Sequence, residues 1–138
     1  MQVLDLFVYD DLCLEDNFKR KFKNIKILDS KYAFTYGILR YNNSKYYFFS
    51  SKRNNKPIFG RYYKLQLEDG DMYELENIYI MYKLEEINIT ILKDVEDITT
   101  CKFLIDKEAR ASIFVGCYMP LRNRRKANVG NVSKYLLI

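Results

Sequence analysis

The segment Val3-Leu4-Asp5-Leu6-Phe7-Val8-Tyr9 is apolar at almost every position, and two acids, Asp10 and Asp11, follow it directly. Strands that are buried on both faces have nearly continuous apolar sequences, whereas half-buried strands alternate. We therefore predict a buried central strand over residues 3–9. Binding sites are often built from loops at strand ends, so the two acids are a first candidate site for a cation or a basic ligand. Asp also favours turns and helix caps, and we favour this structural role for the pair.

Hydrophobic periodicity predicts the remaining elements. Five further segments have the apolar pattern of strands: 31–40, 46–50, 58–67, 82–92 and 110–118. Gly37 is predicted to mark a β-bulge in the first of them. Leu14, Phe18 and Phe22 recur at helical spacing and predict a short helix over residues 14–22. Residues 95–105 fit neither pattern.

The order of these elements indicates the fold class. One strand, a helix, several strands, a second helix and two more strands favour an α+β fold with a barrel-like mixed sheet over an alternating parallel fold. A chain of 138 residues is long enough for one core, and it contains no repeat or linker. We predict a single domain over residues 1–138, in which 119–138 form a basic loop and a docked C-terminal tail.

Composition excludes several kinds of chemistry. The chain has no histidine, which rules out Ser-His-Asp and Cys-His catalysis and any His-ligated metal site. A general base must then be Asp, Glu, Lys, Tyr or Cys. The three cysteines match no metal or redox spacing and are predicted to be free thiols.

The N-terminal residues lack the basic and apolar regions of a signal peptide, and no apolar run approaches the length of a membrane span. We therefore expect a cytoplasmic protein without a membrane partner. The net charge of +5 is concentrated in residues 19–26 and in Arg122, Arg124, Arg125 and Lys126. No nucleic-acid-binding motif accompanies these segments, so we interpret them as solvated surfaces and do not expect a nucleic-acid partner.

A second helix is predicted over residues 71–79, because Asp71 and Glu74 have the spacing of a capping box. At 100° per residue, Glu76 lies within the apolar stripe of this helix. A buried acid is costly unless it is paired or faces a cavity. Periodicity leaves two interpretations equally open: an ion-paired glutamate at the helix edge, or a cavity acid suited to proton transfer.

Five segments resemble, in the same order, the gamma-glutamylcyclotransferase and AIG2-like family. Residues 6–12 resemble its opening strand and Tyr-Gly-Ser/Thr-Leu loop, and 59–65 its Gly-x-x-Tyr strand. Residues 73–77 resemble the helix that carries the family's catalytic glutamate. Residues 82–89 and 111–118 resemble the two strands that follow. The resemblance therefore spans most of the chain.

This resemblance implies a small mixed β-barrel with flanking short helices and a cavity at the end of the first strand. It implies that Glu76 is the general base that helps a γ-glutamyl α-amine attack its own side-chain amide, releasing 5-oxoproline without a metal or cofactor. The ligand would be a small molecule with a γ-glutamyl or related group. The implied substrate-binding residues are Val8, Tyr9, Asp10, Asp11, Leu12, Tyr82 and Tyr118.

The chain departs from the family pattern where the glycine and the Ser/Thr of the loop are replaced by Asp10 and Asp11. Two acids would repel a substrate α-carboxylate and suit a cationic substrate such as a γ-glutamyl amine. Three hypotheses follow: a cyclotransferase-like enzyme with altered substrate choice, a non-catalytic small-ligand-binding module on the same fold, and an interaction module that uses the basic tail. We rank them in that order.

Overall fold

The computed structural model describes residues 1–42, 45–50, 57–78, 83–93 and 105–118. Its strands are β1 (Gln2–Val8), β2 (Lys26–Asn42), β3 (Lys45–Ser50), β4 (Pro57–Leu67), β5 (Lys83–Leu92), β6 (Ile105–Val115) and β7 (Cys117–Tyr118). Its helices are η1 (Asp11–Cys13), α1 (Glu15–Lys21) and α2 (Asp71–Ile78). Of the ambiguous segment 95–105, only Ile105, the first residue of β6, is described. The predicted loop and tail over 119–138 lie outside the described residues.

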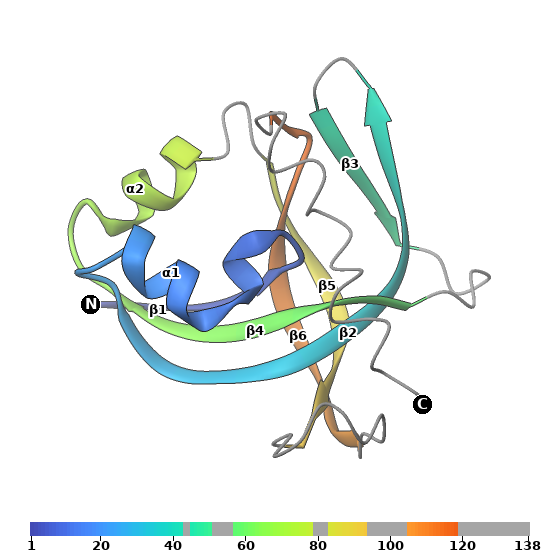
Figure 1. Cartoon of the computed structure of the whole chain (residues 1–138), viewed down its shortest axis with the longest axis horizontal. Helices are drawn as coiled ribbons and strands as arrows, with labels where there is room; N and C mark the ends of the chain where they lie inside the picture. The colour runs from blue at the N-terminus through green and yellow to red at the C-terminus, as the bar shows by residue number, and fades with distance from the viewer. Residues whose placement is uncertain (43–44, 51–56, 79–82, 94–104, 119–138) are drawn as a thin grey trace.

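Five strands form a closed ring of hydrogen bonds (Figure 1). Strand β1 pairs with β4 in the antiparallel sense and with β6 in the parallel sense. Strands β6 and β5 are antiparallel, and β2 pairs with both β5 and β4, which completes the ring. Strands β3 and β7 extend the sheet from the far end of β2. The predicted α+β class and mixed strand pairing are confirmed.

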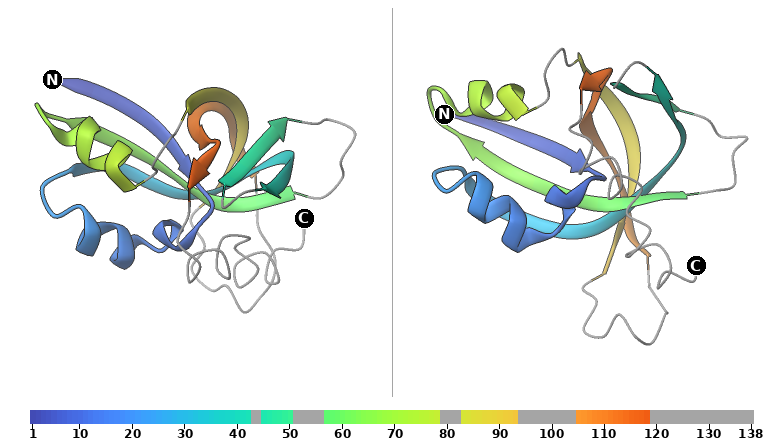
Figure 2. Two further views of the ribbon diagram at one scale, coloured as in Figure 1. Left: turned by 90° about the horizontal axis from the view of Figure 1, so that it is seen from above. Right: turned by 45° about the horizontal axis from the view of Figure 1, so that its top comes forward.

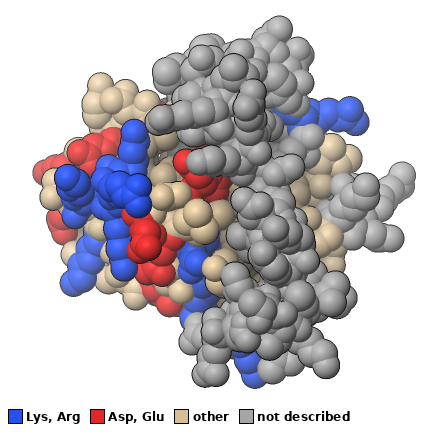
Figure 3. All heavy atoms as spheres, in the orientation of Figure 1, with Lys and Arg blue, Asp and Glu red and all other residues tan. Residues whose placement is uncertain are grey.

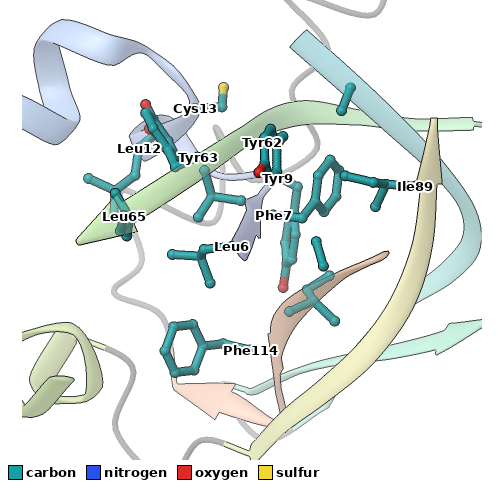
Figure 4. Close-up of a cluster of buried hydrophobic side chains, with 14 of the residues drawn as sticks. Leu6, Phe7, Tyr9, Leu12, Cys13, Tyr62, Tyr63, Leu65, Ile89 and Phe114 are labelled. Carbon is teal, nitrogen blue, oxygen red and sulfur yellow. The ribbon is translucent and has the colours of Figure 1, made fainter. Parts of the chain in front are cut away.

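The core confirms the prediction of a buried central strand. Leu6 is 0% exposed and Phe7 is 1% exposed, although neighbouring residues of a strand project to opposite faces. Figure 4 shows the two side chains projecting to different sides of β1. Ile87, Ile89 and Ile91 of β5 are buried together, as their alternation predicts.

Helix α1 packs on β4 through aromatic contacts. The Phe18 ring stacks on Tyr63 with 4.2 Å between centroids, and the Phe22 ring lies 5.0 Å from Phe18. Leu14 does not share this buried face and is 47% exposed, so the predicted apolar stripe is wrong at its first residue. Leu14 is the N-cap and has an extended backbone, so the helical spacing does not yet apply there.

The predicted bulge at Gly37 is also wrong. Gly37 pairs in register with Ser50, and the irregularity of β2 lies between Ile27 and Asp29. A side chain at Gly37 would meet the Phe48 ring, so close packing explains this glycine better than backbone irregularity does.

The first turn of α2 also differs from its prediction. The Asp71 carboxylate accepts a hydrogen bond from the Glu68 amide at 2.8 Å, outside the helix, rather than capping the helix. The Glu74 amide donates instead to the carbonyl of Gly70, whose φ of 90° makes the tight turn after β4. In the described part of the chain, no helix has the length and hydropathy needed to cross a membrane.

Candidate functional site at the end of strand β1

The chain turns sharply where β1 ends, and Asp10 caps this turn. Its Oδ1 accepts a hydrogen bond from the Leu12 amide at 3.1 Å, and its carbonyl accepts one from the Cys13 amide at 3.0 Å. The Asp10 side chain is 3% exposed. The structural interpretation of Asp10 as a turn and cap residue is therefore confirmed, and its carboxylate is largely withdrawn from solvent.

Two buried side chains of β4 donate hydrogen bonds to carbonyls of this turn. Arg61 Nε donates to the Cys13 carbonyl at 2.6 Å, and the Tyr63 hydroxyl donates to the Leu12 carbonyl at 2.7 Å. Arg61 Nη1 also donates to Ser30 Oγ at 3.0 Å, and the guanidinium lies 4.2 Å from the centroid of the Tyr32 ring. The sequence analysis missed this buried arginine.

Asp11 occupies a different position from its neighbour. Its carbonyl accepts a hydrogen bond from Asn17 Nδ2 at 3.0 Å, which ties the turn to α1. Its side chain is only partly buried, and among the described residues its carboxylate forms no hydrogen bond or ion pair. Of the two acids, Asp11 is therefore the one whose charge can face a ligand.

A small cavity lies beside the turn. It is lined by Phe7, Val8, Tyr9, Asp10 and Phe114 and has a volume of about 10 Å³. Such a space holds about one water molecule. The structure thus brings three of the predicted binding residues together around it, while Leu12 is buried in the adjacent turn. A glutamyl group would need this cavity to open.

Glu76 lies on α2, which starts beside the N-terminal end of β1 because Leu67, the last residue of β4, pairs with Gln2 (Figure 2). The Glu76 side chain is half-buried, next to the fully buried Leu75, while Glu74 and Asn77 on the far side are exposed as predicted. Among the described residues, the Glu76 carboxylate forms no hydrogen bond or ion pair.

The structure brings only part of the predicted site together. Within the described ranges, no hydrogen bond or ion pair joins Glu76 to residues 8–12. Tyr82 lies outside the described residues. The backbone of Tyr118 pairs with Lys45 at the end of the sheet, but the side chain of Tyr118 is not part of the described structure. The described part of the chain also contains no cluster of acids and cysteines that could hold a metal ion.

Burial sets the protonation of the groups around the turn. Burial, and then the charge of Asp10, raise the pKa of the Cys13 thiol from 9.0 to about 12. Burial likewise raises the pKa of Tyr63 well above its usual range. Because thiols react as thiolates, Cys13 is not a nucleophile at neutral pH. Tyr63 stays protonated and remains a hydrogen-bond donor to Leu12.

The raised pKa of Cys13 predicts a loss of stability in alkali. The thiol of the unfolded chain ionises near pH 9, while the folded thiol stays neutral until about pH 12. The free energy of unfolding therefore includes the full contribution of the neutral Cys13 thiol below pH 8. This contribution falls as pH rises, by about 1 kcal/mol between pH 8 and pH 10. We expect Cys13→Ala to remove this part of the slope in urea unfolding measured across that range. Equal slopes for both proteins would contradict the prediction.

Charges of both signs lie on the face that carries α1 (Figure 3). Lys19 pairs with Glu15 at 3.3 Å, and both side chains are substantially exposed. Exposed pairs of this kind contribute little to stability. The mixture of signs and the exposure of the basic residues within 19–26 favour the interpretation of their side chains as a solvated surface, although Phe22 and Ile25 of this range are buried. Residues 122–126 lie outside the described residues.

No protein-family model and no curated protein matches this sequence. Among solved structures, the chain is similar to the solution structure of At5g39720.1 from Arabidopsis thaliana, with a TM-score of 0.49 and 10% sequence identity. The similarity covers 84% of this chain and 70% of that chain.

Proposed function

We propose that the protein is a gamma-glutamylcyclotransferase-like enzyme, that its five-stranded ring is a small closed barrel, and that Glu76 is its general base. The observation that carries the proposal is the state of Glu76: a half-buried carboxylate on α2 with no hydrogen bond or ion pair to the described residues. An acid in such a position is available to accept a proton from a bound substrate. A structural ion pair at the helix edge, the other interpretation of Glu76, would need a cationic partner.

The proposed reaction needs only proton transfer and orientation. The α-amine of a γ-glutamyl group attacks the γ-carbonyl of the same group, so one C–N bond closes the ring of 5-oxoproline. The amide C–N bond breaks, and the leaving amine departs. Glu76 accepts the proton from the attacking nitrogen and returns it to the leaving nitrogen. Because both reacting groups belong to one molecule, holding them in the right geometry supplies much of the rate.

The geometry of the turn favours a cationic substrate. Asp10 is buried and caps its own turn, so only the Asp11 carboxylate is left to act on a ligand at this end of β1. A carboxylate attracts a second ammonium group and repels an acidic one over several ångströms. We therefore propose γ-glutamyl amines whose leaving portion keeps a second, positively charged amino group, ahead of γ-glutamyl conjugates of acidic amino acids.

The test is release of 5-oxoproline from a panel of γ-glutamyl compounds whose leaving portions are cationic, neutral or acidic. We expect turnover of the cationic members, with lower kcat/KM for the neutral and acidic ones. The preference should weaken as salt rises, since screening reduces the attraction of Asp11. Release of 5-oxoproline from none of the compounds would rule out the proposed function.

The altered turn favours a second candidate, a non-catalytic small-ligand-binding module on the same fold. The chain has Asp10 and Asp11 where the family's loop has Gly and Ser/Thr, and the Asp10 carboxylate is buried and bonded within its own turn, so the loop that would orient the reacting groups is changed. Fold alone does not fix function. A ligand-dependent rise in melting temperature with a member of the same panel, without release of 5-oxoproline, would favour this candidate over the enzyme.

A further inference from the structure

We infer that Arg61 and Tyr63 are positioning residues: from β4 they hold the turn formed by residues 10–14 in the conformation that binds the ligand. The inference rests on the proposed function only in assigning the ligand to this turn. Both side chains lie on one face of β4, since residues i and i+2 of a strand project to the same side. They donate to the carbonyls of two consecutive residues, Leu12 and Cys13.

These two bonds orient successive peptide units of the turn. A peptide unit is planar, so fixing a carbonyl also fixes the amide on its other side. The bond from Tyr63 to the Leu12 carbonyl orients the Cys13 amide, and the bond from Arg61 to the Cys13 carbonyl orients the Leu14 amide. The Cys13 and Leu14 amides in turn donate to the carbonyls of Asp10 and Asp11.

Arg61 connects the turn to two other elements, β2 and α1. Besides its bond to Cys13, it donates to Ser30, lies over the Tyr32 ring, and approaches Glu15 of α1 to 3.9 Å. The side chain is 10% exposed, so its bonds are made with little competition from water. A lysine has a single ammonium group and cannot reproduce the fork of donors that reaches Cys13 and Ser30 together.

Of the two residues, Tyr63 allows the more specific substitution. Its ring stacks on Phe18 and is 0% exposed, while its hydroxyl makes the bond to the Leu12 carbonyl. Tyr63→Phe keeps the ring and its packing and removes only this donor. The buried Leu12 carbonyl then loses the only side-chain partner that the described residues give it. Arg61→Lys provides a second variant that keeps the charge.

The first test is amide hydrogen exchange, measured by NMR on the full chain. In Tyr63→Phe and Arg61→Lys we expect the Leu12, Cys13 and Leu14 amides to exchange roughly five- to tenfold faster, the cost of one lost hydrogen bond. The amides of Ile89 and Ile113, in the core strands β5 and β6, should keep their rates. The control is Tyr73→Phe, which loses a hydroxyl from a side chain that is 69% exposed.

Two exchange results would overturn the inference: unchanged rates at residues 12–14, or an equal acceleration at all amides, which would indicate general destabilisation. This test does not depend on turnover. If the wild-type protein releases no 5-oxoproline, the proposed function fails, and the exchange rates still decide whether β4 fixes the turn.

The second test separates positioning from folding by kinetics. With a γ-glutamyl amine as substrate, we expect Tyr63→Phe to raise KM roughly tenfold and to leave kcat within about twofold, because the base lies on α2. A merely structural role would reduce the fraction of active enzyme, which lowers the apparent kcat and leaves KM unchanged. That outcome would overturn the positioning role.

Discussion

The Glu76→Gln protein is expected to release 5-oxoproline from a γ-glutamyl amine at least about a hundredfold more slowly than the wild type. A positioned general base typically contributes a factor of about 10² to 10⁴ to the rate. Glutamine has nearly the same size and shape as glutamate but cannot accept the proton. The loss should appear in kcat, because the substitution leaves the turn at the end of β1 intact.

Helix α2 offers a matched control for this variant. Glu74 lies two residues earlier and is exposed on the opposite side of the helix. Glu74→Gln removes the same charge from the same helix, and we expect it to keep the wild-type rate. Because Glu76 has no ion pair among the described residues, Glu76→Gln should unfold in urea within about 0.5 kcal/mol of the wild type. Comparable losses of activity in Glu76→Gln and Glu74→Gln would show that the activity depends on the negative charge of the helix and not on Glu76 as a general base.

Phe18→Ala is expected to cause the largest loss of stability, about 3 to 5 kcal/mol. The side chain is 0% exposed and its ring stacks on Tyr63, so truncation removes buried area and leaves a cavity between α1 and β4. Urea unfolding measures the change. Leu14→Ala is the control, since Leu14 is 47% exposed and should cost less than about 1 kcal/mol.

The two variants, Phe18→Ala and Leu14→Ala, also test the helix face that was predicted from hydrophobic periodicity. Periodicity places Leu14 and Phe18 on one apolar face of a helix, whereas the structure places Leu14 at the N-cap and only Phe18 in the core. Equal destabilisation by the two substitutions would support the sequence-based interpretation over the structural one.

The sequence predicted strands well where burial leaves a strong local pattern. The apolar run at residues 3–9 indicated β1, and the alternation in the predicted strand 82–92 indicated β5, each within one residue of its observed bounds. The predicted strands 31–40 and 110–118 were wrong at their starts, because β2 and β6 each begin five residues earlier. Gly37 was misread because its neighbour Phe48 comes from the next strand, and a local pattern does not show which ring fills the space beside a glycine.

The candidate site was predicted only in part. Asp10 was interpreted correctly as a cap because its partner, Leu12, lies two residues away. Arg61 and Tyr63 were missed because they bond to carbonyls 48 and 51 residues distant, and such bonds leave no periodic signal. The available clue was that Arg61 shares the alternating apolar face of strand 58–67 with Phe59 and Tyr63, since buried charges usually have partners.

One NMR titration tests most directly whether Glu76 and the turn of residues 10–14 form a single site. The Glu76→Gln protein should bind a γ-glutamyl amine and consume it at least about a hundredfold more slowly than the wild type, which allows its amide shifts to be mapped while the ligand is still intact. We predict that the ligand shifts the amides of Asp11 and Cys13 together with that of residue 76. Shifts confined to other parts of the chain, or none at any ligand concentration, would contradict the account.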